Sequence, residues 1–312
     1  MFIKIDQKVI DLLCCPLCKA EVIPEKECFA CTSCSSHYPL KTTNVGNQLE
    51  KVYDFRIYRP AYCIPESSKL WDKGQQGFES FHKDQHVEDK LKHYLDEINS
   101  VADIYTQEFH IQGSILDVGG HQGKLRHFLS DQAVPLYVSI DPFLNVFENI
   151  QHQPNLLKAY PCLSQPCNFL VAMAENLPFR SNSFDLVHMR SVIDHLEDPF
   201  KAFKEAYRVL KSNGNLMIGL AMMEKLKEAP ALSLWTKVKD KLKKEGIKGV
   251  AMKILKRLIH LADRDHHIFH FTQAELVDLL SITGFKIEKQ HWQKPPFNFC
   301  IYLNASVRDS KR

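Results

Sequence analysis

Residues 114–141 read SILDVGGHQGKLRHFLSDQAVPLYVSID, and this stretch decides the fold. An apolar run ends in Asp117, a glycine turn follows, a helix begins, and a second apolar run ends in Asp141. Gly119 and Gly120 let the backbone turn tightly and approach a ligand where a Cβ atom would collide. The stretch therefore predicts one βαβ unit of an α/β fold that binds a ligand at its glycine turn.

The remaining residues of this unit indicate which ligand it holds. Gly123 begins the helix with little bulk, so the N–H groups there can face a ligand. Asp141 stands 22 residues after Gly119, about where an acid accepts hydrogen bonds from a ribose diol. Asp117 directly precedes the glycine turn. A carboxylate at that place suits a ligand that has a cationic amino-acid end better than one that has a pyrophosphate. The glycine turn alone would also fit a nicotinamide-binding Rossmann protein.

Four further motifs follow in order: AENLPF at 174–179, SFDLVH at 183–188, HLEDP at 195–199 and RVLKSNG at 208–214. With the glycine turn, they resemble the class I S-adenosylmethionine-dependent methyltransferases, of the type 11 kind, over roughly residues 100–290. The resemblance implies an α/β fold with a Rossmann-like, seven-stranded, doubly wound sheet, and S-adenosylmethionine as cofactor. The predicted cofactor-binding residues are Asp117, Gly119, Gly120, Gly123, Asp141, Ala174, Glu175 and, from its place at a strand end, Arg190.

The chain departs from that family pattern at two positions of the predicted pocket. His121 stands where the family has its middle glycine, so the path around the methionine end of the cofactor differs here. Met173 stands where an acid often holds the adenine amino group. We therefore expect backbone and apolar contacts to hold the adenine, with Glu175 nearby.

Composition limits the class of protein. The chain has 312 residues, 45% of them hydrophobic, enough for one large domain with an appendage. A net charge of +3 is too small to indicate, by itself, a protein that binds nucleic acid. The N-terminal residues are too charged for a secretory signal, and no apolar run approaches the length of a membrane span. These features predict a cytoplasmic protein with reduced thiols.

Residues 1–45 form a predicted zinc module. Cys15 and Cys18 make one CxxC pair, and Cys31 and Cys34 make a second after twelve intervening residues. Two such pairs complete a tetrahedral site of four thiolates, which leaves zinc no open position and so predicts a structural role. A redox CxxC pair is the alternative. The sequence around the cysteines resembles the Trm112-like zinc ribbon.

The remainder of the chain divides into three predicted parts. Residues 46–84 are a linker packed on the surface or a lid over the site. Residues 85–312 are the methyltransferase domain, which begins with a helical apolar stripe from Val87 through Leu95 to Phe109. Residues 222–260 form a basic helical insert, suited to an anionic membrane surface or a phosphorylated lipid-linked acceptor; a solvated basic face is the alternative.

Two histidine-bearing segments are candidates for chemistry. His195 follows a strand end by a short helical turn, which places it at the ligand crevice of an open α/β sheet. A hydroxyl acceptor needs its proton removed, and histidine is the usual base near neutral pH, so His195 is the predicted catalytic residue. The cluster at 263–270, DRDHHIFH, is expected to face the acceptor, with metal binding as the alternative.

The predicted function is O-methylation of a small polar acceptor, such as a sugar of a surface glycan or of its lipid-linked precursor. The alternatives are an RNA-base methyltransferase that uses the zinc module to bind substrate, and a non-catalytic adapter with a degenerate cofactor fold. The expected partners are the small-molecule or glycan acceptor and, through residues 222–260, a peripheral membrane surface; nucleic acid is disfavoured by the modest charge. The expected cofactors are S-adenosylmethionine and structural Zn²⁺.

Overall fold

The computed structural model describes residues 2–45, 48–57, 90–130, 133–222, 268–293 and 300–307. Its larger sheet has eight strands in the order β1-β8-β7-β6-β9-β10-β12-β11. Their bounds are β1 Ile3–Lys4, β6 Ser114–Val118, β7 Leu136–Asp141, β8 Cys167–Val171, β9 Phe184–Arg190, β10 Leu210–Ala221, β11 Phe285–Trp292 and β12 Cys300–Val307. The six strands from β1 to β10 are parallel to their neighbours, whereas β12 is antiparallel to both β10 and β11.

The predicted doubly wound sheet is confirmed, with one strand more than expected. Seven strands, β6 to β12, come from the region predicted as the methyltransferase domain, and the eighth, β1, comes from the N-terminal module. The order reverses between β6 and β9, where the chain goes from one half of the sheet to the other. Ligands of open α/β sheets bind beyond the carboxyl ends of the strands at such a switch point.

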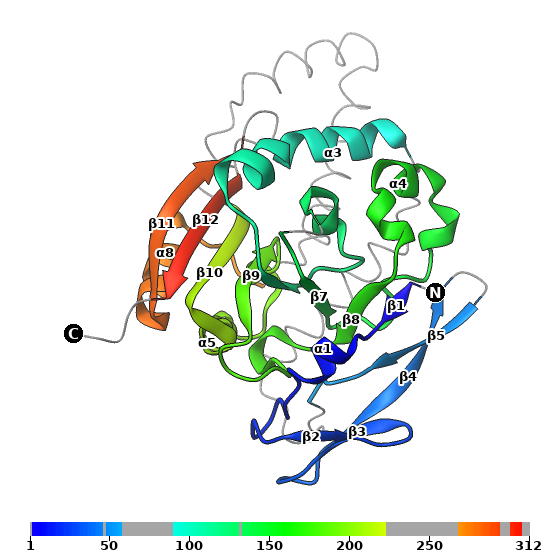
Figure 1. Cartoon of the computed structure of the whole chain (residues 1–312). Coiled ribbons are helices and arrows are strands. Elements are labelled where there is room, and N and C mark those ends of the chain that lie inside the picture. Colours follow the sequence, from blue (N-terminus) through cyan, green and yellow to red (C-terminus); the bar gives the residue numbers. More distant parts are fainter. Residues whose placement is uncertain are drawn as a thin grey trace, which may run out of the picture.

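Helices cover both faces of this sheet (Figure 1). On one face lie α3 (Leu91–Asp103), its π-helical continuation η2 (Ile104–Glu108), the 3-10 turn η3 (Lys124–Phe128) and α4 (Pro154–Ala159), with buried Tyr94, Val101 and Tyr105. On the other lie α5 (Pro199–Val209) and α8 (Gln273–Thr283), which bury Phe203 and Leu276. Each face therefore has its own apolar core, as expected for parallel strands covered on both sides.

The helix ends show why the sequence forms these elements where it does. The Asp198 side chain accepts a hydrogen bond from Lys201 N at the start of α5, and Pro199 occupies the first turn. Thr272 and Glu275 form a reciprocal capping box at the start of α8, and Gly284 ends the helix at φ +102°. No helix of the described residues is both long and apolar enough to cross a membrane.

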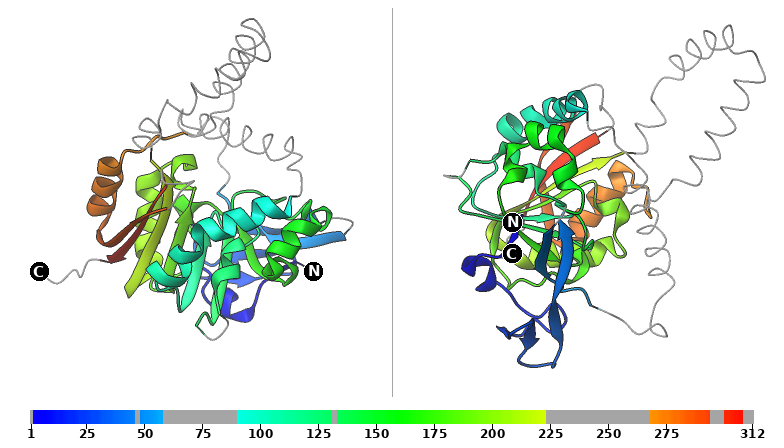
Figure 2. Two further views of the ribbon diagram at one scale, coloured as in Figure 1. Left: turned by 90° about the horizontal axis from the view of Figure 1, so that it is seen from above. Right: turned by 90° about the vertical axis from the view of Figure 1, so that its right-hand side faces the viewer.

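A second, four-stranded sheet belongs to the N-terminal module. Its strands are β2 (Val22–Pro24), β3 (Cys28–Cys31), β4 (His37–Val45) and β5 (Gln48–Tyr53), paired in antiparallel order. The strands of this module lie on the β8 side of the large sheet, away from β11 and β12 (Figures 1 and 2). The module boundary predicted after residue 45 falls between β4, which ends at Val45, and β5, which begins at Gln48.

The N-terminal module shares the apolar core of the α5 and α8 face. Its residues Val9, Leu13 and Phe29 are fully buried in the same cluster as Leu177 and Phe203. The backbone continues this contact, because Phe2 O accepts from Cys167 N at 2.8 Å and Phe55 N donates to Val171 O at 2.7 Å. The two parts of the chain therefore form a single packed unit.

Candidate active site and metal centre

A pocket lies at the carboxyl edge of the large sheet, beside the switch point. It holds about 570 Å³ of space not filled by protein atoms, part of which is open to solvent. Its lining includes five of the residues predicted for cofactor or catalysis: Gly119, Asp141, Ala174, Glu175 and His195. It also includes Met173, expected beside the adenine, and eight residues that the sequence did not single out: Val118, Ile140, Pro142, Phe143, Ala172, Ser191, Val192 and Leu196.

The turn after β6 has the close packing that its glycines allow. Gly119 has φ +65°, and a Cβ atom there would lie 2.4 Å from Val192 Cγ2. A Cβ atom on Gly120 would lie 2.5 Å from Asp117 Cγ, so neither position accepts a side chain. His121 also has a left-handed backbone, at φ +49°. Its carbonyl accepts from Ser139 Oγ at 3.0 Å, which holds the turn in place.

Asp141 presents a buried carboxylate at the end of β7. Its Oδ1 accepts from Phe143 N at 3.0 Å, and the N–H of His121 also donates to this carboxylate. Burial raises the pKa of Asp141 to about 7, those two hydrogen bonds oppose the rise, and the charge of Asp117 adds to it. The carboxylate therefore titrates near neutral pH while it lines the pocket.

Asp117 does not line this pocket, although the sequence suggested that it faces a cationic ligand end. The residue is 3% exposed, and its carboxylate accepts from the Tyr137 hydroxyl and from His188 Nδ1, the latter at 2.7 Å. His188 Nε2 lies 3.0 Å from the Tyr105 hydroxyl. Because a carboxylate only accepts, Nδ1 of His188 carries the proton, and Asp117 supports the glycine turn from below.

Two other predicted cofactor residues lie near the pocket without lining it. Gly123 has φ +82° and ends the turn, with its N–H bonded to Gly120 O at 2.8 Å. Arg190 ends β9 directly before Ser191, and its Nη1 lies 3.5 Å from Glu97 Oε1. Their direct contact with a cofactor stays a prediction.

Glu175 lines the pocket but directs its carboxylate at the backbone. Its Oε1 accepts from the N–H groups of Glu197 at 2.8 Å and Asp198 at 3.2 Å. Burial raises the pKa of Glu175, against the effect of these hydrogen bonds. This residue therefore positions the segment that follows His195.

His195 lies on the wall of the pocket at the end of the 3-10 turn η7 (Ile193–His195). Its side chain is 16% exposed, and its Nε2 lies 3.8 Å from Asp194 Oδ1. Asp194 O accepts from Ile268 N at 2.8 Å and Phe269 N at 3.1 Å. The described end of the 263–270 cluster therefore lies beside Asp194, the neighbour of His195 in the chain, and its contact with the acceptor stays a prediction.

The N-terminal module and the first residues of the segment predicted as a linker or lid contact the rim of the pocket. Arg56 forms an ion pair with the buried Asp54, and its Nη1 donates to Pro142 O at 3.0 Å. Thr43 Oγ1 donates to Asn145 Oδ1 at 2.9 Å, close after Phe143. The one signal in the sequence was the acid–aromatic–base run DFR at 54–56.

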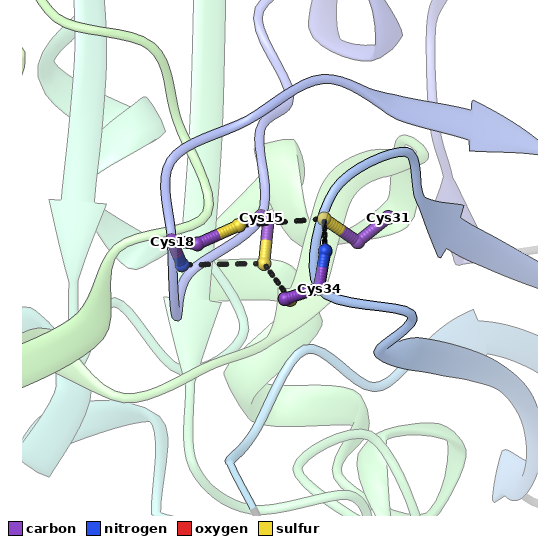
Figure 3. A group of neighbouring side chains, drawn as sticks. All are labelled: Cys15, Cys18, Cys31 and Cys34. Atoms are coloured by element: carbon purple, nitrogen blue, oxygen red, sulfur yellow. Dashed lines mark hydrogen bonds between the residues drawn. The ribbon is translucent and has the colours of Figure 1, made fainter.

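The four predicted zinc ligands come together in this module (Figure 3). The sulfur atoms of Cys15, Cys18, Cys31 and Cys34 all lie within 4.8 Å of one another. The Cys15–Cys34 and Cys18–Cys31 sulfur pairs are 3.6 and 3.4 Å apart. A tetrahedron with Zn–S bonds of about 2.3 Å has sulfur atoms roughly 3.8 Å apart, so the cluster fits a structural zinc ion.

Hydrogen bonds around the sulfur atoms support the same assignment. Cys15 Sγ lies 2.9 Å from the Tyr38 hydroxyl, and the N–H of Cys18 points at the same sulfur from 3.4 Å. The side chain and backbone of Ser36 lower the pKa of Cys34 to about 6, which favours a thiolate. Hydrogen-bond donors that contact a metal-bound sulfur orient it and stabilise its thiolate form.

Several predictions fall outside the described residues. They include most of the linker or lid segment, from residue 58 to its end, and the basic insert after Met222. The histidines at 266 and 267 belong to the same group.

Comparison with known proteins finds one matching domain family and relatives that are similar over part of the chain. A family model described as a methyltransferase domain matches residues 116–218. The ubiquinone/menaquinone biosynthesis C-methyltransferase of Rickettsia bellii is 35% identical over 108 residues, which are 34% of this chain and 44% of that protein. The Rickettsia prowazekii enzyme of the same name is 34% identical over the same share. The chain thus spans less than half the length of these relatives.

Solved structures of methyltransferases align over more of the chain at low identity. The 1,6-didemethyltoxoflavin-N1-methyltransferase of Burkholderia thailandensis, solved with S-adenosylhomocysteine, is 11% identical with a TM-score of 0.48. That alignment covers 91% of this chain and 100% of the other.

Proposed function

We propose that this chain, whose residues 116–218 form a methyltransferase domain, transfers a methyl group from S-adenosylmethionine to a hydroxyl of a small polar acceptor. One observation carries the proposal. The acid Asp141, the glycine turn and the half-buried His195 surround one pocket at the switch point of the sheet. An acid that could hold a ribose and a candidate base thus line the same pocket, which supports the proposal.

The residues present fit the cofactor. Asp141 would accept hydrogen bonds from the ribose hydroxyls, and Met173, Phe143 and Leu196 offer apolar surface for the adenine. Gly119 allows the backbone to approach the ligand. S-adenosylmethionine supplies a methyl group on a positively charged sulfur, which leaves as a neutral thioether.

His195 is the proposed base. Its imidazole would take the proton of the acceptor hydroxyl as the oxygen forms its bond to the methyl carbon, so the acceptor ends as a neutral ether and the proton rests on His195. Glu175 fixes the segment after His195 through two backbone N–H groups. The remaining contribution of the pocket is positioning of the two reactants and exclusion of water.

A sugar of a glycan or of its lipid-linked precursor is the proposed acceptor, supported by the motif order and by the basic composition of residues 222–260. The same segment supports peripheral contact with an anionic membrane. C-methylation of a hydroxylated ring is the second candidate, because the Rickettsia relatives that match over 108 residues are C-methyltransferases. Proton removal from a hydroxyl by His195 serves both reactions.

A methyl-transfer assay on zinc-loaded protein tests the proposal. S-adenosylhomocysteine formation is followed with nucleotide sugars, glycolipids and hydroquinones, and NMR of the product distinguishes a methyl group on oxygen from one on carbon. Replacing His195 with Ala should lower kcat by about 10²- to 10⁴-fold, the usual contribution of a general base, and leave S-adenosylhomocysteine affinity nearly unchanged. His152→Ala, an exposed histidine outside the pocket, is the matched control. Full activity of His195→Ala would remove the base from the proposal.

A further inference from the structure

The backbone that follows Asp141 is contacted from outside the methyltransferase domain by the side chain of Arg56. Residue 56 comes three residues after the end of β5, whereas the domain match begins at residue 116. Arg56 Nη1 donates to Pro142 O at 3.0 Å, and Pro142 lies between Asp141 and Phe143, which line the pocket with it. This contact is not used in the function proposed above.

The carboxylate of Asp54 holds the guanidinium of Arg56 in one orientation. Its Oδ1 accepts from Arg56 Nε at 2.9 Å and from the Arg56 backbone N–H at 3.1 Å, and its Oδ2 accepts from Nη2 at 2.7 Å. The Asp54 side chain is fully buried, and that of Arg56 is 27% exposed. Paired hydrogen bonds between a guanidinium and a carboxylate fix the geometry of both groups, so Nη1 is directed at Pro142 O.

The backbone of residues 54–56 is anchored at the carboxyl end of β8. Asp54 forms an isolated parallel bridge with Val171, the last residue of β8, and Phe55 N donates to Val171 O at 2.7 Å. The Phe55 side chain is fully buried. Because β8 pairs with β7, strand pairing and packing place this segment beside the turn that follows β7.

A second side chain of the N-terminal part contacts the same turn. Thr43 of β4 is 2% exposed, and its Oγ1 donates to Asn145 Oδ1 at 2.9 Å. The segment 142–145 is therefore contacted at both of its ends. Within it, Phe143 N donates to Asp141 Oδ1 at 3.0 Å, so the orientation of this carboxylate depends on where the segment lies.

We propose that Arg56 and Thr43 are positioning residues for the acid that binds the ribose of the cofactor. They act through segment 142–145, whose N–H group at Phe143 orients the Asp141 carboxylate toward the ribose hydroxyls. Hydrogen bonds weaken steeply when their distance and angle depart from the optimum, so a small shift of this segment costs affinity. The inference rests on the proposed function, since it requires a ligand with a ribose in this pocket.

Calorimetric titration with two ligands that differ only in the ribose tests the inference. S-adenosylhomocysteine has both ribose hydroxyls and its 2′,3′-dideoxy analogue has neither, so the ratio of the two dissociation constants measures what the hydroxyls contribute. The wild-type protein should prefer S-adenosylhomocysteine by about tenfold or more, the usual contribution of hydrogen bonds to a charged group. In Arg56→Ala and in Thr43→Val this preference should fall to about threefold or less, with affinity for the dideoxy analogue nearly unchanged.

Three further variants keep the test independent of folding defects. Removing Arg56 alone leaves the buried Asp54 carboxylate without this cation, and breaking one side of a buried ion pair lowers stability. The double variant Asp54→Asn with Arg56→Met removes both charges and should lose the preference in the same way, even if Arg56→Ala does not fold. Arg56→Lys keeps a charged donor and should recover part of the preference. Lys51→Ala removes an exposed lysine of β5 and should change neither affinity.

The outcomes separate a positioning role from a structural one. A preference that stays unchanged in Arg56→Ala and in Thr43→Val, or an equal loss of affinity for both ligands, overturns the inference. A wild-type protein that binds both ligands equally tightly also overturns it, because the ribose hydroxyls then contribute nothing at Asp141. A wild-type protein that binds neither ligand overturns the proposed function itself.

Discussion

His121 is the residue at which this pocket departs most from a glycine turn. Its backbone has φ +49°, a region that costs a residue with a Cβ atom about 1–2 kcal/mol relative to glycine. We predict that the free energy of unfolding of His121→Gly exceeds that of His121→Ala by about 1 kcal/mol. Both variants lose the imidazole, but only glycine relieves the strain of the left-handed backbone. Urea denaturation of the two variants measures the difference. Equal stabilities would contradict a left-handed residue at this position.

Asp141 should make cofactor binding depend on pH. In the proposed site the ionised carboxylate would accept hydrogen bonds from the ribose hydroxyls, and the pKa of Asp141 is raised to about 7. Affinity for S-adenosylhomocysteine should therefore rise roughly tenfold between pH 6 and pH 8 as the carboxyl loses its proton. Titration at both pH values tests this, with Asp141→Asn as the control that should show no such rise and a loss of about 1.5 kcal/mol at pH 8.

The raised pKa of Asp141 also predicts how the stability of the unliganded protein depends on pH. This stability should fall as pH rises, whereas cofactor affinity should rise. Because the folded pKa of Asp141 lies above its usual value of 3.8, the stability contributed by this group is full below pH 4 and is lost as pH rises through 7. Asp141→Asn should therefore melt at a higher temperature than the wild-type protein at pH 8 without ligand. An equal or lower melting temperature would show that burial does not strain this carboxylate.

At the scale of elements, the zinc module supports the segment 172–180 that follows β8. Ala174 and Glu175 of this segment line the pocket, and its other end pairs with the module through the Leu13–Phe179 bridge and the bond from Cys14 N to Pro178 O at 3.0 Å. A zinc ion that orders the module therefore also orders one wall of the pocket.

Loss of a zinc ligand should consequently also weaken ligand binding in the pocket. We predict that Cys34→Ser loses its zinc, melts about 5 °C lower or more, and binds S-adenosylhomocysteine more weakly. Elemental analysis, thermal unfolding and titration measure the three effects. Cys28→Ser changes a cysteine of the same module outside the cluster and should alter none of them. A zinc-free wild-type protein would remove the ribbon assignment.

The elements were predictable from sequence where the pattern is local. The strands that end in Asp117 and Asp141, the strand before Ser191 and the capping box of α8 follow from apolar runs and end signals. The helical stripe expected from Val87 to Phe109 holds at Leu91, Ile98, Tyr105 and Phe109, which pack in the core, and is wrong at Leu95, which is 43% exposed while Tyr94 is buried instead. The helix passes into the π-helical turn η2 at Ile104, and Tyr105 and Phe109 remain buried beyond that point.

Contacts between distant residues were not predictable in the same way. Nothing in the two residues Ile3–Lys4 predicts that they form the edge strand β1, since its partner β8 lies over 160 residues later in the chain. The inward turn of Asp117 depends on His188 and Tyr137, which reach it only through strand pairing. The site residues that sequence placed well, Asp141 and His195, are those fixed by their position after a strand.

For the whole molecule, the shared core predicts one cooperative unit. Leu13 and Phe29 of the N-terminal module are buried with Leu177 and Phe203 of the methyltransferase domain. We predict that the full chain unfolds in a single calorimetric transition and that removing residues 1–57 leaves an aggregating domain with an uncovered β8 edge. Two separate transitions, or a soluble folded truncation, would contradict the shared core.

The pocket beside Asp141 is the proposed binding place of S-adenosylmethionine. Calorimetric titration of the zinc-loaded protein with S-adenosylhomocysteine at pH 8, with NAD titrated in parallel, tests this. We expect one S-adenosylhomocysteine to bind per chain with a dissociation constant in roughly the micromolar range, and NAD not to bind. Binding of NAD alone, or of neither ligand, would show that this pocket does not hold S-adenosylmethionine.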